Sequence, residues 1–443
     1  MEKVDTLINA RWVIPVAPDC VPREHCSLVL HHGRILDLLP ETEARARYDA
    51  REIIERPTHA LIPGLVNSHT HAAMSLLRGL ADDLPLMEWL KNHIWPVERQ
   101  WVGPEFVADG SELAIAEMLR GGTTCFNDMY FFPDVTARTA ARLGIRACVG
   151  LIVLDHPSAW AESAAEYLSK GLVLADEYKG HPLISCAFAP HAPYTVGDET
   201  LVKVRKLSDE LELPIHTHLH ETADEIKSSV SAFGERPLAR FARLGLMTPL
   251  LQAVHMTQLY EAEIQAAARA GINVVHAPQS NMKLASGACP VESLLAAGIN
   301  VSLGTDGAAS NNDLDMLSEM HTASLLAKHV AANAQALDAP ASLRMATFNG
   351  AMALGLGEVT GSLEAGKWAD ITCIDLAPLN TQPVYDPVAQ IVYSANRDQV
   401  SDVWVGGRQQ LSGGRLTRID TDDLAARAAA WGKRIGSGEE ESN

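Results

Sequence analysis

Residues 61–71 decide the fold: they read LIPGLVNSHTH, an apolar run that ends in the pair His69 and His71. A continuous apolar run of this kind predicts a strand that is buried on both faces. Side chains alternate along a strand, so two histidines separated by one residue point to the same side. Two nitrogen ligands on one wall are half of a zinc site. The importance of the pair therefore depends on whether the rest of the chain supplies the other half.

Composition sets broad limits on the answer. The chain has 443 residues, 47% hydrophobic and 21% charged, which is typical of a packed protein with one large domain and a smaller one. A net charge of −19 argues against a duplex nucleic acid as partner, because that would require a basic face. The seven cysteines are scattered without a C-x-x-C pair, and no secretory signal or membrane-spanning apolar stretch is visible. We therefore expect a cytoplasmic protein.

Eight short apolar runs, most of them separated by helix-like segments, lie between residues 60 and 305. They are residues 61–66, 123–127, 146–154, 183–189, 214–218, 251–255, 272–276 and 299–304. Eight strands alternating with helices predict an α/β fold, a (β/α)8 TIM barrel, which we assign to residues 60–360 as the catalytic domain. In that fold the active site lies at the carboxyl ends of the strands. Polar residues with a chemical role should therefore follow the strands.

The two ends of the chain have a different pattern. Residues 1–59 contain short alternating runs with a turn at His32-Gly33-Arg34, and residues 361–443 contain a hairpin signal at Gly406-Gly407-Arg408. These segments predict one small β-sandwich domain that is formed from both termini. A helix around residues 422–432 completes that domain.

Five of the eight predicted strands end in side chains that can bind a metal. They are His69 and His71 at strand 1, His191 at strand 4, His218 at strand 5, His255 at strand 6 and Asp306 at strand 8. A buried structural histidine or a helix-capping aspartate would explain any one of them. Chance is a poor explanation for all five positions at the same end of one barrel.

This arrangement resembles the amidohydrolase superfamily, and within it the aminohydrolases that use a single metal ion. The similarity is carried by His69-x-His71, His218, His255 and Asp306. Residues 63–79, 95–98, 216–222 and 304–314 are similar to the methylthioadenosine/S-adenosylhomocysteine deaminases, and the likeness covers essentially the whole chain. Binuclear members carry a lysine at the end of strand 4, whereas residues 189–191 here read Ala-Pro-His. The resemblance therefore favours a mononuclear centre.

The resemblance implies one zinc ion per subunit, bound by His69, His71, His218 and Asp306. Asp306 would take a proton from the zinc-activated water and deliver it to the leaving amine. Glu221 would protonate the ring nitrogen, and His255 would donate a hydrogen bond to the oxygen on the attacked carbon. The implied reaction is hydrolytic deamination of 5′-methylthioadenosine to 5′-methylthioinosine, with S-adenosylhomocysteine to S-inosylhomocysteine as a second conversion.

The resemblance also implies the contacts to the small-molecule nucleoside substrate. It places Glu98 on the ribose hydroxyls, His191 near the ribose or the base, and Trp89 as an apolar wall, while Glu221 and Asp306 contact the base. His216 is read as a barrel-packing residue behind the ligands and His220 as structural. A homodimer or homotetramer fits the resemblance.

The expected substrate preference rests on the lack of a positively charged side chain for the carboxylate of S-adenosylhomocysteine. Relatives that accept S-adenosylhomocysteine need a positive group, often arginine, for its carboxylate, and no arginine lies between residues 151 and 186. We therefore expect methylthioadenosine to be preferred. The alternatives are an aminohydrolase of another heterocycle (adenosine, guanine or a triazine), a binuclear hydrolase of cyclic amides, and a non-catalytic scaffold of the same fold. The scaffold predicts lost ligands, yet every expected ligand is present.

Overall fold

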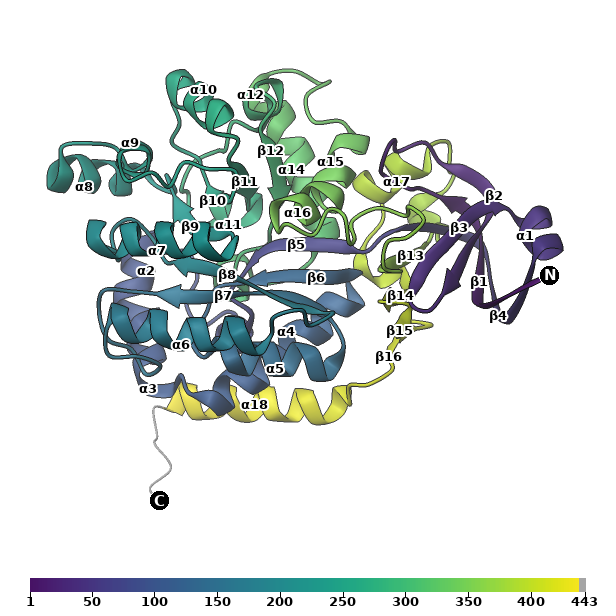
Figure 1. Cartoon of the computed structure of the whole chain (residues 1–443), viewed down its shortest axis with the longest axis horizontal. Coiled ribbons are helices and arrows are strands. Elements are labelled where there is room, and N and C mark those ends of the chain that lie inside the picture. Colours follow the sequence, from purple (N-terminus) through teal and green to yellow (C-terminus); the bar gives the residue numbers. More distant parts are fainter. Residues whose placement is uncertain (438–443) are drawn as a thin grey trace.

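Two eight-stranded sheets make up the computed structural model, which describes residues 1–437 (Figure 1). The last six residues of the predicted terminal domain, 438–443, lie outside the described residues. One sheet consists entirely of parallel strands from the middle of the chain, and the other combines strands from both ends. The predicted barrel with a smaller β-domain built from both termini is thus confirmed. Within residues 1–437, no helix is both long and apolar enough to cross a membrane.

The barrel strands follow one another in chain order around the sheet. They are β5 (Leu65–Thr70), β6 (Thr123–Asp128), β7 (Arg146–Val153), β8 (Ile184–Pro190), β9 (Ile215–Leu219), β10 (Leu251–His255), β11 (Asn273–His276) and β12 (Asn300–Leu303). Nearly every residue in these strands is buried, because helices cover the outside and side chains fill the inside. Continuous apolar runs are what such strands require, which is why they could be found in the sequence.

The first apolar run is divided between the two sheets. Residues 61–63 form the end of β4 (Tyr48–Pro63), which pairs with β13 (Ile371–Asp375) in the terminal sheet, and β5 of the barrel begins at Leu65. Gly64 separates the two strands, and a Cβ atom there would overlap the side chain of Thr124. The crossing between the sheets therefore requires glycine. It also places His69 within β5 rather than beyond its end.

The barrel closes where β12 meets β5, through side chains as well as backbone. The Thr305 amide donates to Asn67 Oδ1 at 3.0 Å, and Asn67 Nδ2 donates to Thr305 Oγ1 at 2.7 Å. The Asp306 amide then donates to the His69 carbonyl at 3.0 Å. A Cβ atom at Gly304 would lie 2.7 Å from the His69 nitrogen, so only glycine allows this approach. Closure brings the polar ends of the first and last strands together.

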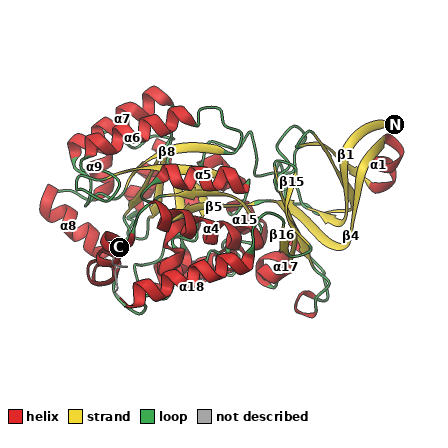
Figure 2. Cartoon of the chain, turned by 90° about the horizontal axis from the view of Figure 1, so that it is seen from below, coloured by secondary structure: helices red, strands yellow, loops and turns green. Residues whose placement is uncertain are grey.

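Helices cover the outside of the barrel strands (Figure 2). The segments between the strands and after β12 are η1 (Ala72–Leu77), α2 (Leu86–Trp89), η2 (Leu90–Ile94), α3 (Trp95–Trp101), α4 (Pro104–Arg120), α5 (Pro133–Leu143), α6 (Ala164–Glu177), α7 (Asp198–Leu211), α8 (Ala223–Phe233), α9 (Pro237–Arg243), α10 (Glu261–Ala270), α11 (Pro278–Lys283), α12 (Val291–Ala296), α13 (Ala308–Asn311), α14 (Met316–Ala331), α15 (Ala339–Met345) and α16 (Phe348–Ala353). Several of the long helices end at a glycine with positive φ, as at Gly144 and Gly271. The helices leave the carboxyl ends of the strands to the connecting loops.

The terminal sheet has the order β16-β15-β14-β13-β4-β1-β2-β3. Its further elements are β1 (Glu2–Val13), β2 (Arg23–His31), β3 (Arg34–Pro40), α1 (Glu41–Arg47), β13 (Ile371–Asp375), η3 (Leu379–Thr381), α17 (Pro387–Tyr393), η4 (Arg397–Gln399), β14 (Val400–Val405), β15 (Arg408–Ser412) and β16 (Arg415–Leu416). The last helix, α18 (Thr421–Ser437), leaves this sheet and runs along α4 of the barrel (Figure 1). Trp431 Nε1 donates to Asp109 Oδ2 at 2.9 Å, and its ring meets the edge of Phe106. Domain boundaries at residues 59/60 and 360/361 stay a prediction.

Candidate metal centre and catalytic site

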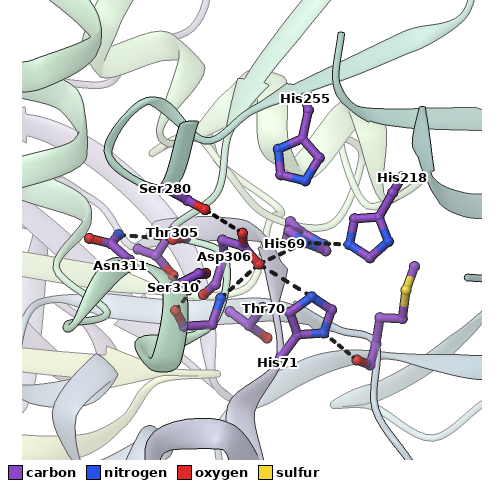
Figure 3. Close-up of polar contacts among 12 residues, drawn as sticks. His69, Thr70, His71, His218, His255, Ser280, Thr305, Asp306, Ser310 and Asn311 are labelled. Atoms are coloured by element: carbon purple, nitrogen blue, oxygen red, sulfur yellow. Dashed lines mark hydrogen bonds and ion pairs between the residues drawn. The ribbon is translucent and has the colours of Figure 1, made fainter. Parts of the chain in front are cut away.

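Three imidazoles and one carboxylate meet at the carboxyl end of the barrel, with their ligand atoms facing one another (Figure 3). Asp306 Oδ1 lies 3.3 Å from His69 Nε2 and 3.2 Å from His71 Nε2. His218 Nε2 lies 3.2 Å from His69 Nε2. Ligands about 2.0–2.1 Å from a tetrahedral zinc ion are separated by about 3.3 Å. The cluster therefore has the dimensions of a zinc site, and the four predicted ligands lie together.

The other ring nitrogen of each histidine is held by a fixed partner. His71 Nδ1 lies 2.6 Å from the Met129 carbonyl, and His218 Nδ1 lies 2.8 Å from the His191 carbonyl. A carbonyl can only accept, so both Nδ1 atoms carry a proton and both Nε2 atoms face the cluster. His69 Nδ1 lies 2.9 Å from His216 Nε2, which places His216 behind the ligands as expected. Such partners orient ligand rings and fix their tautomers.

Burial sets the charge states of the cluster. It lowers the pKa of His69 and takes that of His218 well below the usual value, so both rings are neutral at pH 7. Burial also works to raise the pKa of Asp306, but hydrogen bonds from His69 and His71 hold it well below its usual range. Burial works to lower the pKa of His71 as well, but the hydrogen bond and the charge of Asp306 raise it above its usual value, so a metal ion would take the place of a proton on that ring. The cluster is thus three imidazoles beside an ionised carboxylate. This is the donor set that a divalent cation prefers.

The second oxygen of Asp306 is also held in place. Ser280 Oγ donates to Asp306 Oδ2 at 2.6 Å, and the Gly307 amide donates to Oδ1 at 2.8 Å. The backbone of Asp306 has φ +64°, an unfavourable value for a residue with a side chain. Packing and these hydrogen bonds hold the strained conformation. One carboxylate oxygen thus faces the histidines, while the other accepts a hydrogen bond from Ser280.

Glu221 and His255 lie on the same side of the cluster, with Glu221 Oε2 3.8 Å from His255 Nε2. Asn281 Nδ2 donates to His255 Nδ1 at 2.9 Å, so the His255 proton is on Nε2 and points toward the site. Burial lowers the pKa of His255 to about 3, and the ring is therefore neutral. Burial, and then the charges of Asp306 and Glu225, raise the pKa of Glu221 well above its usual value. Glu221 therefore keeps its proton to a higher pH than an exposed glutamate does.

Two of the predicted substrate residues border the cluster. Glu98, on α3, accepts a hydrogen bond from the Tyr130 hydroxyl at 2.7 Å, and burial raises its pKa to about 7. His191 follows β8, and its ring centre lies 4.9 Å from that of His218. Burial lowers the pKa of His191 to about 3, so it is a neutral hydrogen-bonding group. Their predicted contacts with the nucleoside stay predictions.

Trp89 takes a different position. Its indole is buried in a hydrophobic cluster that includes Met74 and Leu77 of η1, and its Nε1 donates to the Ala81 carbonyl at 3.1 Å. These contacts are those of a structural residue that fixes the segment after strand 1. Its predicted role as a wall of the pocket is not tested by this packing.

His220 is structural, as expected. Its Nδ1 lies 3.0 Å from the Gln258 carbonyl, and its Nε2 accepts from the Leu238 amide at 2.9 Å. Ser280 and Asn281, by contrast, contact Asp306 and His255 but were not singled out in the sequence. The signal was available, because both residues follow the seventh predicted strand at the same end of the barrel.

A cavity of about 410 Å³ adjoins the site. Its lining includes His156 after β7, Tyr194 after β8, and Glu225 and Phe233 on α8. Glu225 accepts a hydrogen bond from the Glu221 amide at 2.6 Å. The ring centre of Tyr194 lies 6.1 Å from that of His191. Glu225 and Tyr194 therefore connect the cavity to the site, although none of the catalytic residues lines it.

Comparisons with known proteins agree with this geometry. Residues 60–409 match the model of the amidohydrolase family. The chain is 50% identical to the 5-methylthioadenosine/S-adenosylhomocysteine deaminase of Teredinibacter turnerae, and the alignment covers 98% of each chain. It is 48% identical to the deaminase of the same name from Saccharophagus degradans, with 97% of each chain covered. It superposes with a TM-score of 0.98 on the crystal structure of an adenosine deaminase from Xanthomonas campestris with bound zinc, at 53% identity, covering 98% of this chain and 99% of that one. The chain belongs to the amidohydrolase family.

Proposed function

We propose that this protein is a zinc-dependent aminohydrolase that deaminates 5′-methylthioadenosine and, less efficiently, S-adenosylhomocysteine. The observation that carries the proposal is a pair of carboxyl groups at one cluster whose pKa values are shifted in opposite directions: that of Asp306 is lowered and that of Glu221 is raised. Groups whose environments separate their pKa values in this way serve as base and acid. The curated relatives at 48–50% identity are named for this activity, and the related crystal structure holds zinc.

The residues present divide the reaction among themselves. A zinc ion bound by His69, His71, His218 and Asp306 would supply a Lewis acid and a water molecule that is ionised near neutral pH. The carboxylate of Asp306 accepts the proton of the attacking water through the oxygen that Ser280 contacts. It later gives that proton to the amino group, so that ammonia leaves as the carbon–nitrogen bond breaks.

Glu221 supplies the second proton transfer. Its carboxyl group protonates the ring nitrogen beside the attacked carbon, which makes that carbon electrophilic. The hydroxyl proton on the attacked carbon returns to Glu221 as the carbonyl forms, so the enzyme is restored. The Nε2–H group of His255 is available to stabilise the oxygen that develops negative charge. Water and an aminopurine are thereby converted into an oxopurine and ammonia.

The lining of the cavity near the site supports a preference for methylthioadenosine over S-adenosylhomocysteine. We propose that it receives the 5′-substituent of the nucleoside. Its lining contains no lysine or arginine, but it includes Asp155 and Glu225. An uncharged methylthio group needs no charged partner, whereas the homocysteine tail carries a carboxylate beside its ammonium group, and the lining offers no cation to that carboxylate. The proposed position of Glu98, on the ribose hydroxyls, leaves the 5′-substituent free to extend elsewhere.

A panel of ammonia-release assays tests the proposal. Metal-stripped protein should be inactive, and one equivalent of zinc per chain should restore activity toward methylthioadenosine. We expect kcat/KM to fall in the order methylthioadenosine, S-adenosylhomocysteine and adenosine, with none for guanine. A higher kcat/KM for S-adenosylhomocysteine would contradict the cavity argument, and a higher value for adenosine would contradict the thioether substrate. Two tightly bound zinc ions in the barrel would contradict the mononuclear centre.

Two further properties are also proposed. A reducing, cytoplasmic location is supported by seven free cysteines, all of them buried except the partly exposed Cys20. Assembly into a homodimer or homotetramer is supported by the family resemblance and is testable by sedimentation. Neither property enters the chemistry above.

A further inference from the structure

A second group of metal-binding side chains lies in the terminal sheet, at the turn between β2 and β3. Asp5 of β1, His31 at the end of β2 and His32 in the turn bring one ligand atom each within 4.8 Å of one another. His31 Nδ1 lies 3.4 Å from Asp5 Oδ2, and the two imidazole ring centres are 3.9 Å apart. The turn belongs to the part of the chain labelled β2 and β3 in Figure 1, away from the barrel strands.

The backbone explains how adjacent histidines reach the same place. Neighbouring side chains on a strand point to opposite faces. His32 departs from the strand with φ +49°, and Gly33 follows with φ +77°. Two left-handed residues form the two-residue turn that joins His31 to its partner Arg34, and such a position favours asparagine or glycine. A histidine is therefore unusual at this position, and because His32 is exposed, packing does not explain its presence.

The third ligand is placed by strand pairing. Thr6 pairs with Leu30 in the β1–β2 ladder, so Asp5 lies opposite His31 at the next position. The His32 amide donates to Asp5 Oδ2 at 2.6 Å, which fixes the carboxylate beside both rings. The Nδ1 atom of His31 is shielded from solvent and makes no hydrogen bond within residues 1–437. A buried nitrogen without a hydrogen bond, facing a carboxylate, is an available ligand.

The turn is held rigidly against the other end of the chain. The Ala369 amide donates to the Gly33 carbonyl at 2.9 Å, and Arg34 Nη1 donates to the Gly366 carbonyl at 2.7 Å. A Cβ atom at Gly33 would lie 2.6 Å from the Gly406 carbonyl oxygen, so the turn packs closely on the hairpin beneath it. The ligands are therefore carried by fixed backbone, which lowers the cost of ordering them around an ion.

We propose that Asp5, His31 and His32 form a second site for a late first-row divalent cation such as Zn²⁺. Two imidazoles and one carboxylate suit such ions, whereas Mg²⁺ and Ca²⁺ prefer oxygen ligands. The 3.4 Å between His31 Nδ1 and Asp5 Oδ2 matches the separation of about 3.3 Å between ligands of a tetrahedral zinc ion. The site ties β1 to the β2–β3 turn and leaves one coordination position to solvent. It is independent of the proposed reaction.

Partial exposure sets the strength of this site relative to the barrel centre. The exposed ring of His32 makes no hydrogen bond or ion pair within residues 1–437 that would orient it, in contrast to the rings of His71 and His218. Lost partners behind the ligands lower metal affinity about 10–100-fold. The second equivalent of zinc should therefore bind at least about tenfold more weakly than the first.

Calorimetric titration of zinc into protein that already holds one equivalent tests the proposal. Wild-type protein should bind one further equivalent, and excess Mg²⁺ should not displace it. The variants Asp5→Asn and His32→Asn should lose this binding by at least tenfold, and asparagine is a residue that the left-handed turn accepts. His329→Asn is the matched control, because His329 is an exposed histidine in the last turn of α14 and lies outside the cluster.

Each outcome of the titration supports or overturns the proposed second metal site. Loss of the second equivalent in both cluster variants, with unchanged ammonia release and unchanged circular dichroism, supports the site. Absence of a second equivalent in the wild type overturns it. Equal binding by wild type, Asp5→Asn and His32→Asn overturns it as well, because the ion would then bind elsewhere. A misfolded His32→Asn variant leaves Asp5→Asn to decide, since that change keeps the size of the side chain.

Discussion

Histidines and an aspartate meet at two places in this protein, and the surroundings of the two clusters differ more than their ligands do. In the barrel, His69 is fully buried and Asp306 is 5% exposed, and each ring is oriented by a partner on its other nitrogen. In the β2–β3 turn, Asp5 and His32 are exposed. Burial and fixed partners shift pKa values and separate acid from base, whereas exposed ligands can only hold an ion. Chemistry therefore belongs to the barrel cluster alone.

The largest effect should come from Asp306→Asn. This change keeps the shape of the side chain but removes the charge that faces His69 and His71 and the oxygen that accepts a proton. We expect kcat for methylthioadenosine to fall at least about 10⁴-fold, because a ligand and a general base are lost together. Asp5→Asn is the matched change in the turn cluster and should leave kcat unchanged. Activity of Asp306→Asn within tenfold of wild type would contradict the assigned role.

Glu221→Gln should have the next largest effect. It removes the proton for the ring nitrogen but leaves the four candidate ligands intact, so we expect kcat to fall about 10²–10⁴-fold with zinc content unchanged. Burial raises the pKa of Glu221 well above its usual value, so its acid form persists to a higher pH than that of an exposed glutamate. The kcat/KM of the wild type should decline as pH rises through that raised pKa. The decline should be absent from Glu221→Gln, and an identical profile in both proteins would exclude Glu221 as the acid.

The sequence predicted the parts of both regions that follow from periodicity. Continuous apolar runs indicated the barrel strands, and the positions after them indicated His69, His71, His218 and Asp306, which the structure brings together. The rule works because the carboxyl ends of parallel strands meet at one edge. It says nothing about loops, where a side chain's direction depends on turns that no period describes. Ser280 and Asn281 follow the seventh predicted strand, so the sequence could have placed them at this end of the barrel, but their contacts with Asp306 and His255 became visible only in the structure.

Two failures of prediction have the same physical origin. The apolar run at residues 61–66 reads as one strand, but Gly64 divides it between two sheets because the close approach of Thr124 leaves no room for a side chain. The turn at His32-Gly33-Arg34 was identified, but the meeting of His31, His32 and Asp5 was not. It depends on a positive φ at a histidine and on pairing with a distant strand. Local sequence patterns do not predict the register of distant strands or a left-handed backbone conformation.

A moderate effect is expected for Ser280→Ala. The variant loses the hydroxyl that donates to Asp306 Oδ2, the oxygen proposed to carry the proton. Removing a partner behind a metal ligand typically costs about 10–100-fold in activity or affinity. We expect kcat to fall within that range while the fold is retained. Ser310→Ala is a suitable control, since Ser310 Oγ donates to the Gly307 carbonyl and not to Asp306. Equal activity of both variants would contradict the role of Ser280.

A smaller effect should appear in the pH dependence of substrate binding. Burial raises the pKa of Glu98 to about 7, so the group is protonated below that pH and ionised above it. An ionised carboxylate accepts hydrogen bonds from ribose hydroxyls more strongly than a protonated one. The KM for methylthioadenosine should therefore decrease by up to about tenfold as pH rises from 6 to 8, with its midpoint at the Glu98 pKa of about 7. A KM for Glu98→Gln that shows the same decrease would contradict the assignment.

The smallest effect returns to the turn, where the comparison between the clusters is sharpest. A histidine at φ +49° occupies a position that favours asparagine, so its strain should be relieved by His32→Asn. In metal-free protein, we expect that variant to be more stable than wild type by about 0.5–1 kcal/mol, comparable to other substitutions that suit the local backbone. Added zinc should raise the Tm of wild type more than that of His32→Asn, because only the wild type would gain binding energy at the turn. If His32 lowers the stability of the metal-free protein and raises that of the zinc-bound protein, its role in the turn is to bind the ion. If instead His32→Asn is less stable in metal-free protein, the histidine stabilises the turn by its own packing, and its position in the left-handed region needs no ion to explain it.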